Sequence, residues 1–235
     1  MTDSVLRAEI AEQPDVLRRL LRDGAPDVER VAESLRAHTV RHVVIAARGS
    51  SDNAARYAQY VFGACNRLIV SLATPSLFTR YHAAPQMDGA LVIGVSQSGE
   101  SPDLVAVVAE GRRQGCQTLA ITNVADSPLA KAAHDVIELR AGREQSIAAT
   151  KTYTAQLTAL AMLSTALAQD AVRWRDLARV PEFVAAAAGV DDTIVVDAAE
   201  TLRGAGHGVV LVRGFNFATA FELALKAKEL AHVAV

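Results

Sequence analysis

Short apolar runs rich in β-branched residues alternate along the chain with longer, Ala-rich stretches whose apolar positions recur every three or four residues. This alternation predicts an α/β fold in which helices cover both faces of a doubly wound, five-stranded parallel sheet. The strands are predicted at 42–47, 68–72, 90–95, 117–122 and 135–139. Three of them are apolar almost throughout, as strands buried on both faces are, so we expect the first, third and fourth strands in the middle of the sheet.

Helices are predicted on either side of the strand region. The apolar spacing indicates two helices before the first strand, at 5–21 and 27–38. Between them, Gly24-Ala25-Pro26 supplies a glycine that ends one helix and a proline that begins the next. A long amphipathic helix is expected at 150–169, and a further helical stretch at 181–202.

The end of the chain repeats the opening of the sheet. The segment V-V-L-V-R-G-F-N at 209–216 resembles V-V-I-A-A-R-G-S-S at 43–51, so residues 208–212 predict another strand that leads through a loop into a helix. No further strand follows before Val235, and we therefore expect this unit to be incomplete in the chain. The expected organisation is N-terminal helices at 1–40, a first domain at 41–170, a helical connection at 171–204 and the beginning of a second, similar domain at 205–235.

Composition narrows the classes of function. The chain has 24 Lys and Arg against 26 Asp and Glu, so it lacks the basic excess that neutralises phosphates in nucleic-acid binding. No apolar run reaches the roughly 18 residues of a membrane span, and the N-terminus is acidic and polar where a signal peptide would be basic and then apolar. Cys65 and Cys116 form no metal-binding or disulfide pattern. We expect a cytoplasmic protein that contacts neither membrane nor nucleic acid and holds no metal.

Three loops rich in small hydroxyl residues precede predicted helices, at 48–53, 96–102 and 146–151. In an open parallel sheet, ligands bind beyond the carboxyl ends of the strands, where glycines, hydroxyls and helix amides can hold a phosphate. No Walker lysine pattern is present, so the loops favour a phosphate monoester over a nucleoside triphosphate. The alternative is that these residues only cap the helices. Ser96 and Ser98, followed by Gly99 and Pro102, are the most specific signal.

Charged residues mark the last predicted helix. Glu222, Lys226 and Glu229 are spaced by four and three residues, which places them on one side of a helix. From the spacing alone, this side is either a solvated, ion-paired surface or part of a site.

Six blocks, taken together and in order, resemble one family. They are E-I-A-E-Q-P at 9–14, A-R-G-S-S at 47–51, S-Q-S-G-E-S at 96–101, A-I-T-N-V at 120–124, A-A-T-K-T-Y-T-A-Q-L at 148–157 and R-G-F-N-F-A-T-A-F-E-L-A-L-K-A-K-E-L at 213–230. In these blocks the chain resembles the sugar isomerase (SIS) domain family. Within it, the chain is similar to the isomerase half of glucosamine-6-phosphate synthase, the glutamine-fructose-6-phosphate aminotransferase, and to SIS-type glucosamine-6-phosphate deaminases.

The resemblance implies a binding site for a hexose 6-phosphate. The residues that would hold the phosphate and the neighbouring hydroxyls lie in the first two loops: Gly49, Ser50, Ser51, Ser96, Gln97, Ser98 and Ser101. Ile147 and Ala149 would line the sugar through their backbone, and Ala149 stands where the synthase has a serine.

The resemblance also implies the chemistry. Glu229 would be the general base that carries a proton between C1 and C2 of the open-chain sugar, with Lys226 as its neighbour and Glu222 in support. A carboxylate suits this step, because burial can raise its basicity towards neutrality, so Glu229 is expected to be buried. No metal or organic cofactor is implied.

We therefore expect a homodimeric enzyme that interconverts glucosamine 6-phosphate and fructose 6-phosphate. The chain carries no glutaminase segment, which favours a glucosamine-6-phosphate deaminase. The enzymatic alternatives are a fructosamine-6-phosphate deglycase and an isomerising aminotransferase supplied with ammonia by another protein. The alternative from another class is a non-catalytic phosphosugar sensor, which would need neither Glu229 nor its spacing from Lys226.

Overall fold

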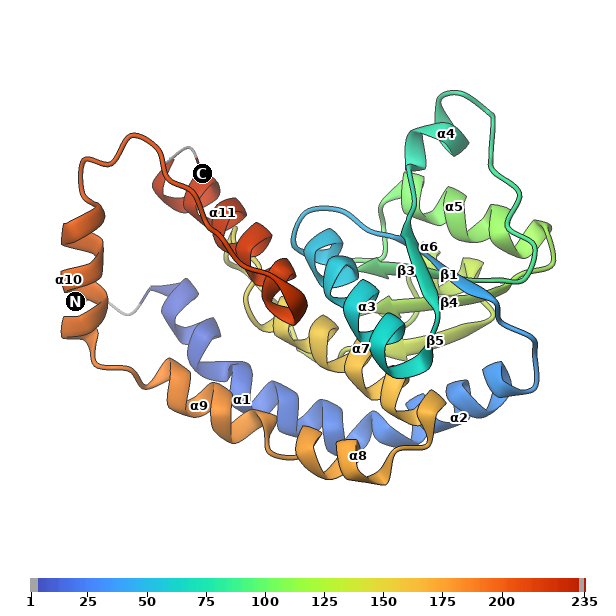
Figure 1. Cartoon of the computed structure of the whole chain (residues 1–235), viewed down its shortest axis with the longest axis horizontal. Helices are drawn as coiled ribbons and strands as arrows, with labels where there is room; N and C mark the ends of the chain where they lie inside the picture. Colours follow the sequence, from blue (N-terminus) through green and yellow to red (C-terminus); the bar gives the residue numbers. More distant parts are fainter. Residues whose placement is uncertain (1–3, 233–234) are drawn as a thin grey trace.

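The computed structural model describes residues 4–232 and 235. Five strands form one sheet in the order β2-β1-β3-β4-β5, and every neighbouring pair is parallel (Figure 1). The strands are β1 (His42–Ala46), β2 (Ile69–Leu72), β3 (Ala90–Ser96), β4 (Gln117–Thr122) and β5 (Asp135–Glu138). The predicted five-stranded parallel sheet is confirmed, and so is the central position of the first, third and fourth strands.

Helices cover both faces of the sheet. On one face lie α1 (Val5–Asp23), α2 (Ala25–Arg36), α3 (Ser50–Asn66) and α7 (Lys151–Ala168). On the other lie α4 (Pro75–Thr79), α5 (Pro102–Arg113) and α6 (Pro128–Ala132). Side chains of β1 point to both faces of the sheet: Val43 and Ile45 pack in the hydrophobic core beneath α1, α2, α3 and α7, and Ala46 packs in the core beneath α4, α5 and α6.

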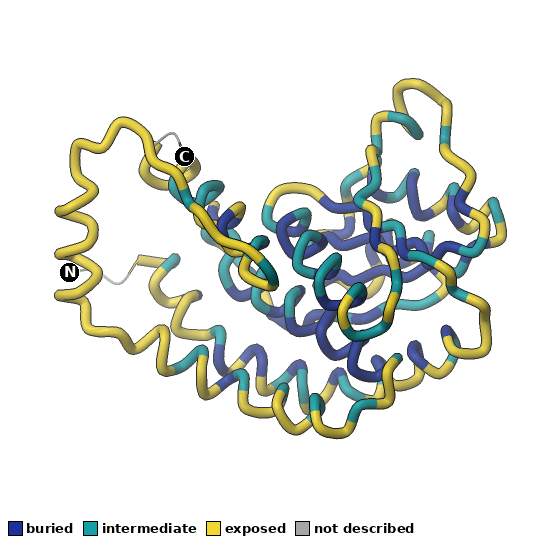
Figure 2. The backbone as a smooth tube through the Cα atoms, viewed as in Figure 1, coloured by how far each residue is buried: buried dark blue, intermediate teal, exposed yellow. Residues whose placement is uncertain are grey.

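The helix α7 differs from its prediction. It was expected to be amphipathic, but thirteen of its eighteen residues are buried. It packs against α1, α2 and α3 together, and Figure 2 shows it in dark blue over most of its length. A helix that is enclosed on several sides needs apolar or small residues all round rather than along one stripe.

The C-terminal part runs away from the sheet along α8 (Ala171–Leu177), α9 (Val180–Ala188) and α10 (Asp192–Leu202), and returns through a 3₁₀ turn (Gly214–Asn216) to α11 (Phe217–Ala231) (Figure 1). The single helix predicted at 181–202 is two helices. Gly189 ends α9, and the Asp191 carboxylate accepts a hydrogen bond from the Thr193 amide at 2.9 Å, which caps α10.

The strand predicted at 208–212 is wrong: none of these residues pairs as a strand with another residue that the structure describes, and Val209 and Leu211 are 79% and 86% exposed. A strand needs a hydrogen-bonded neighbour, and an apolar run alone does not supply one. The helix predicted after it is present as α11, so the loop and helix of the repeat form without their strand. The assignment of 205–235 to the beginning of a second domain stays a prediction.

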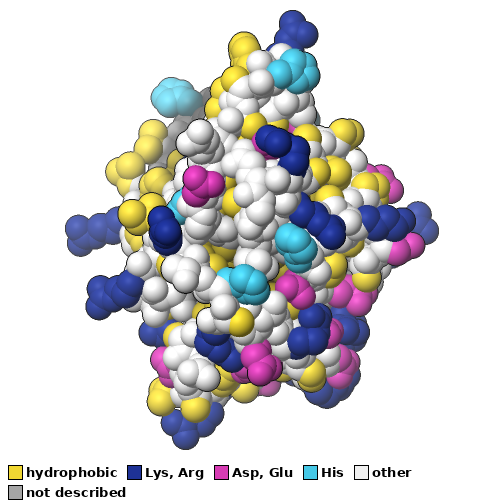
Figure 3. All heavy atoms as spheres, turned by 90° about the vertical axis from the view of Figure 1, so that its right-hand side faces the viewer, with side chains coloured by type: hydrophobic (Ala, Val, Ile, Leu, Met, Phe, Trp, Pro, Cys, Tyr) yellow, Lys and Arg dark blue, Asp and Glu magenta, His cyan; other side chains and the backbone are white. Residues whose placement is uncertain are grey.

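Across the described residues, no helix is both long enough and apolar enough to cross a membrane. Basic and acidic side chains stand beside one another on the face drawn in Figure 3, together with several histidines. His38, His82 and His134 are exposed, in keeping with this mixed surface.

Candidate functional site

The loops after β1 and β3 leave the sheet in opposite directions. The chain passes from β1 into α3 on one face, and from β3 into α5 on the other. Since β1 and β3 are neighbours, this is the switch point of the sheet, where a crevice opens at the carboxyl ends of the strands. The first two predicted loops therefore lie side by side.

The loop after β3 is held by its own side chains and by a glycine. The Ser96 hydroxyl accepts a hydrogen bond from the Gly99 amide at 3.1 Å, and the Ser98 hydroxyl accepts one from the Glu100 amide at 3.3 Å. Gly99 has a positive φ of 67°, and an added Cβ would lie 2.1 Å from the Ser127 Oγ. Only glycine fits this turn without displacing Ser127.

A cavity of about 120 Å³ lies where the three predicted loops meet α11. Seven predicted site residues line it: Ser50, Ser51, Gln97, Ile147, Ala149, Lys226 and Glu229. The structure thus brings together residues that are up to 179 positions apart, as between Ser50 and Glu229. Three residues that the sequence analysis did not single out share the lining: Arg48, Thr152 and Gln156.

The remaining predicted residues lie around this cavity rather than on its lining. Gly49 has a φ of 56° and precedes the first residue of α3, and Ser101 precedes the first residue of α5. Ser96 is buried beneath the second loop. Ser98 lines an adjoining hollow of about 650 Å³, which it shares with Gln97.

Glu222 joins α11 to the start of α3. Its carboxylate accepts hydrogen bonds from the Ser50 hydroxyl at 2.9 Å and from the Asn53 side-chain amide at 2.8 Å. It is 7% exposed, and the Lys226 ammonium lies 3.3 Å from it. The Ser50 hydroxyl proton is therefore committed to Glu222. Glu222 is a buried, fully partnered carboxylate behind the cavity.

Lys226 bridges this buried carboxylate to the cavity rim. Its ammonium donates to the Ser50 Oγ at 3.0 Å and to the Glu229 carboxylate at 2.8 Å. The Glu229 side chain is 35% exposed, so the expectation of a buried Glu229 is wrong. Glu222 is covered because it faces α3 from the first half of α11, whereas Glu229 stands two turns further on, where the helix nears its end.

Aromatic contacts fix α11 against α3. The ring of Tyr60 lies 6.0 Å from that of Phe217, and the guanidinium of Arg56 lies 4.3 Å from the centre of the Phe221 ring. Beside this contact, burial raises the pKa of the Tyr153 hydroxyl, and the negative charge of Glu222 raises it further. Tyr153 therefore stays neutral next to the carboxylate.

Gln156 is a site residue that the sequence reasoning missed. Its amide nitrogen donates to the Ser51 hydroxyl at 2.9 Å, while its buried amide oxygen has no hydrogen-bond partner among residues 4–232 and 235. A buried amide oxygen without a hydrogen-bond donor costs free energy, and a donor group of a bound ligand would remove this cost. The available signal was the spacing of Thr152 and Gln156, two polar residues one turn apart in the first half of the helix that follows the third loop.

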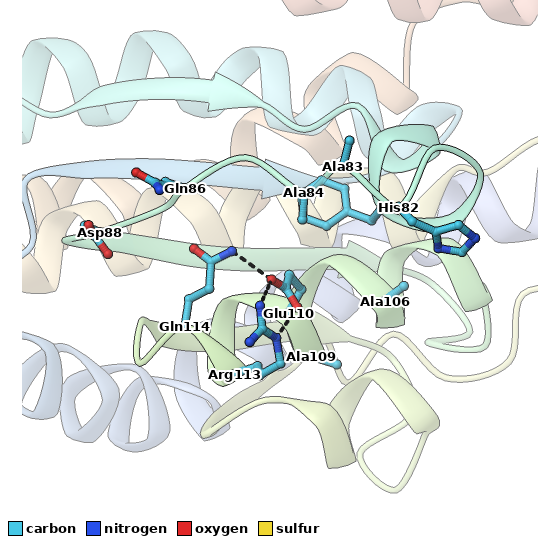
Figure 4. A pocket seen from close by; sticks show the side chains of 11 residues that line it. His82, Ala83, Ala84, Gln86, Asp88, Ala106, Ala109, Glu110, Arg113 and Gln114 are labelled. Carbon is cyan, nitrogen blue, oxygen red and sulfur yellow. Dashed lines mark hydrogen bonds and ion pairs between the residues drawn. The ribbon is translucent and has the colours of Figure 1, made fainter.

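A larger cavity, of about 860 Å³, lies elsewhere, between α5 and the segment that follows α4 (Figure 4). Two of its lining residues bind the Glu110 carboxylate: Arg113 donates to it at 2.7 Å, and Gln114 donates to it at 2.8 Å. These hydrogen bonds hold the pKa of Glu110 at about 2. None of the predicted site residues lines this cavity, so size does not identify the site here.

The model of the SIS domain matches residues 38–166 of the chain. The chain belongs to the SIS domain family. This SIS chain is 34% identical, over 98% of its length, to a glutamine–fructose-6-phosphate aminotransferase [isomerizing] from Methanothermobacter thermautotrophicus, of which it covers 38%. It thus spans less than two fifths of the length of the curated relatives it matches.

Solved structures share its architecture. A candidate phosphosugar isomerase from Silicibacter pomeroyi superposes with a TM-score of 0.93 at 38% identity, over 98% of this chain and 70% of that one. A glucosamine-6-phosphate deaminase from Thermotoga maritima superposes with a TM-score of 0.76 at 21% identity, over 98% and 68%, which is a likeness in fold. Membership of the SIS domain family and the SIS fold are thereby established for the chain.

Proposed function

We propose that this SIS chain binds a hexose 6-phosphate and supplies the proton-transfer groups for aldose-ketose isomerisation of an amino sugar. The observation that carries the proposal is the Lys226–Glu229 pair on the lining of a cavity that Ser50, Ser51 and Gln97 also line. A phosphate-binding sensor needs only the loops. An isomerase also needs a carboxylate beside them, and the chain has one.

The proposed substrate is glucosamine 6-phosphate. The two hydroxyl-rich loops, with Ser96, Ser98 and Ser101 beside Ser51 and Gln97, would hold the phosphate. The backbone of Ile147 and Ala149 would face the sugar, and the unused amide position of Gln156 would meet a sugar hydroxyl. The assignments of the loop residues follow the family resemblance, and the cavity that several of these residues share supports them.

The proposed reaction is deamination to fructose 6-phosphate and ammonia. Glu229 takes the proton from C2 of the open-chain sugar and delivers it to C1, while one proton passes from the C2 amine to the C1 oxygen, so that C1 carries a hydroxyl group and C2 an imine. One water then adds at C2 and ammonia leaves, so that glucosamine 6-phosphate and water give fructose 6-phosphate and ammonia. Lys226, 2.8 Å from Glu229, would orient that carboxylate. Water is the only other reactant.

The test separates binding from proton transfer. Calorimetric titration with glucosamine 6-phosphate should show binding, and glucosamine without phosphate should not bind. In deuterated water, the wild-type protein should introduce deuterium at C1 or C2 of the sugar. Glu229→Gln should lower that exchange by about 10²–10⁴-fold while the sugar phosphate still binds.

Asp15→Asn serves as the control, since Asp15 is an exposed carboxylate on α1, away from the cavity. Equal exchange in the wild type and in Glu229→Gln would refute the base assignment. Binding without any exchange in the wild type would favour the sensor.

A homodimer is part of the proposal, and sedimentation of the protein with and without the sugar phosphate tests it.

A further inference from the structure

One block of the sequence, E-I-A-E-Q-P at 9–14, has no part in the site proposed above. It lies on α1, which is far from the sheet loops in sequence, yet its first residue is a carboxylate that is only 3% exposed. A buried carboxylate is costly unless it is paired and hydrogen-bonded. The partners of Glu9 therefore show what the block does.

Glu9 binds the start of the third loop. It accepts hydrogen bonds from the Gln145 amide at 2.5 Å, from the Ser146 amide at 3.1 Å and from the Ser146 hydroxyl. Burial alone would raise the pKa of Glu9, but the hydrogen bonds from Ser146 and Gln145 and the charge of Lys151 hold the pKa below its ordinary value. Glu9 is thus a charged acceptor that holds two consecutive loop amides.

The other end of the loop is tied to the same helix. Lys151, the first residue of α7, is 3% exposed, and its ammonium lies 3.7 Å from the Glu9 carboxylate and 2.6 Å from that of Glu12. Glu144 supports the loop separately by accepting a hydrogen bond from the Thr150 amide at 2.8 Å. Both ends of the segment 145–151 are therefore bound to side chains of α1.

Two residues between these ends, Ile147 and Ala149, line the cavity. The Ser146 hydroxyl, which donates to Glu9, lies 2.9 Å from the Ala148 carbonyl oxygen, so the Glu9 contact reaches into the cavity wall. By contrast, Glu9 has no hydrogen bond to the loops at 48–53 and 96–101. Its effect is confined to the wall that would face the sugar.

We propose that Glu9, paired with Lys151, is a positioning residue that sets the conformation of loop 145–150 for the sugar ring. This inference rests on the proposed function, because it assigns the loop to the sugar. It predicts that Glu9 acts on the recognition of the sugar and leaves the recognition of the phosphate alone. A residue needed only for folding would affect both.

The experiment compares two ligands in Glu9→Gln. Gln keeps the size of the side chain but removes the charge and replaces one acceptor oxygen with a donor that faces the loop amides. The dissociation constant for glucosamine 6-phosphate should rise by about ten- to a hundredfold, as expected for a misplaced wall of a site. The dissociation constant for inorganic phosphate should stay within about twofold. Asp15→Asn, on the exposed side of the same helix, should change neither.

Ser146→Ala provides the second variant, because it removes one donor to Glu9 from a half-buried loop without placing a new group in the core. Ser146→Ala should also raise the dissociation constant for glucosamine 6-phosphate. If Glu9→Gln does not fold, Ser146→Ala alone tests the inference. Unchanged sugar-phosphate binding in the folded variants, or an equal loss of both ligands, would overturn the inference. If the wild type binds neither ligand, the proposed function itself fails.

Discussion

Gly99→Ala tests whether the turn after β3 is held as the structure describes. The methyl group would meet two obstacles. A residue with a side chain at a φ of 67° costs about 1–2 kcal/mol, and the new Cβ would lie 2.1 Å from the Ser127 Oγ. To make room, Ser127 must give up its cap of α6, where its hydroxyl accepts from the Ala130 amide at 3.3 Å, and such a cap is worth about 1 kcal/mol. The expected loss in free energy of unfolding is about 2–3 kcal/mol.

Gly115→Ala is the matched control. Gly115 has a φ of 79°, but no atom of the described part of the chain lies within 4 Å of an added Cβ. This variant therefore carries the strain without the clash and should lose about 1–2 kcal/mol. Urea unfolding followed by circular dichroism measures both variants, and titration with inorganic phosphate should show weaker binding only for Gly99→Ala. If the two variants unfold at the same urea concentration and bind phosphate alike, the contact with Ser127 does not shape the loop.

Two further predictions follow from charged groups. Arg48 lines the site cavity and donates to Asp103 at 2.7 Å. Arg48→Ala removes a positive charge from the site, so it should weaken glucosamine 6-phosphate binding by about tenfold and flatten the salt dependence of binding. Arg113→Ala breaks a comparable ion pair away from the site and should change neither. Because the pKa of Glu9 is lowered below 4.5 in the folded chain, Glu9 stabilises the fold at pH values above 4.5, and this contribution is lost as the pH falls through the lowered value. Urea midpoints measured between pH 7 and pH 3 should therefore fall more steeply for the wild type than for Glu9→Gln, and parallel curves would contradict this.

The sheet could be predicted because its signals are local. Strands such as β4, at Gln117–Thr122, are apolar runs bounded by turn residues, and burial on both faces requires that composition. The segment at 208–212 carries the same signal and forms no strand, because strand formation also depends on a neighbour that the local pattern cannot specify. The prediction that α7 is amphipathic was wrong for a related reason: the number of helices packed around it depends on the whole fold and not on its own sequence.

The candidate site was predictable as a set of loops but not as a set of contacts. Ser50, Ser51 and Gln97 could be placed near one another, because strands that are neighbours in a parallel sheet end at one edge. The contact between Glu9 and Ser146 spans 137 positions and depends on α1 lying across α7, which no spacing rule predicts. Only the arrangement of the helices explains why the block at 9–14 belongs with this site.

Glu222 and Glu229 show the same limit for chemistry. On a helix, the spacing of seven residues places both carboxylates on one side, and this spacing alone gives no reason to treat them differently, although the family resemblance does. The structure separates them, since Glu222 has both its oxygens engaged by Ser50 and Asn53, whereas Glu229 stands on the cavity lining and, among the residues that the structure describes, is bound by Lys226 alone. A carboxylate with committed oxygens can hold α11 in place, and one with free lone pairs can accept a proton from a bound sugar. This difference in partners, rather than in burial, supports our proposal that Glu229 transfers the proton and Glu222 anchors the helix.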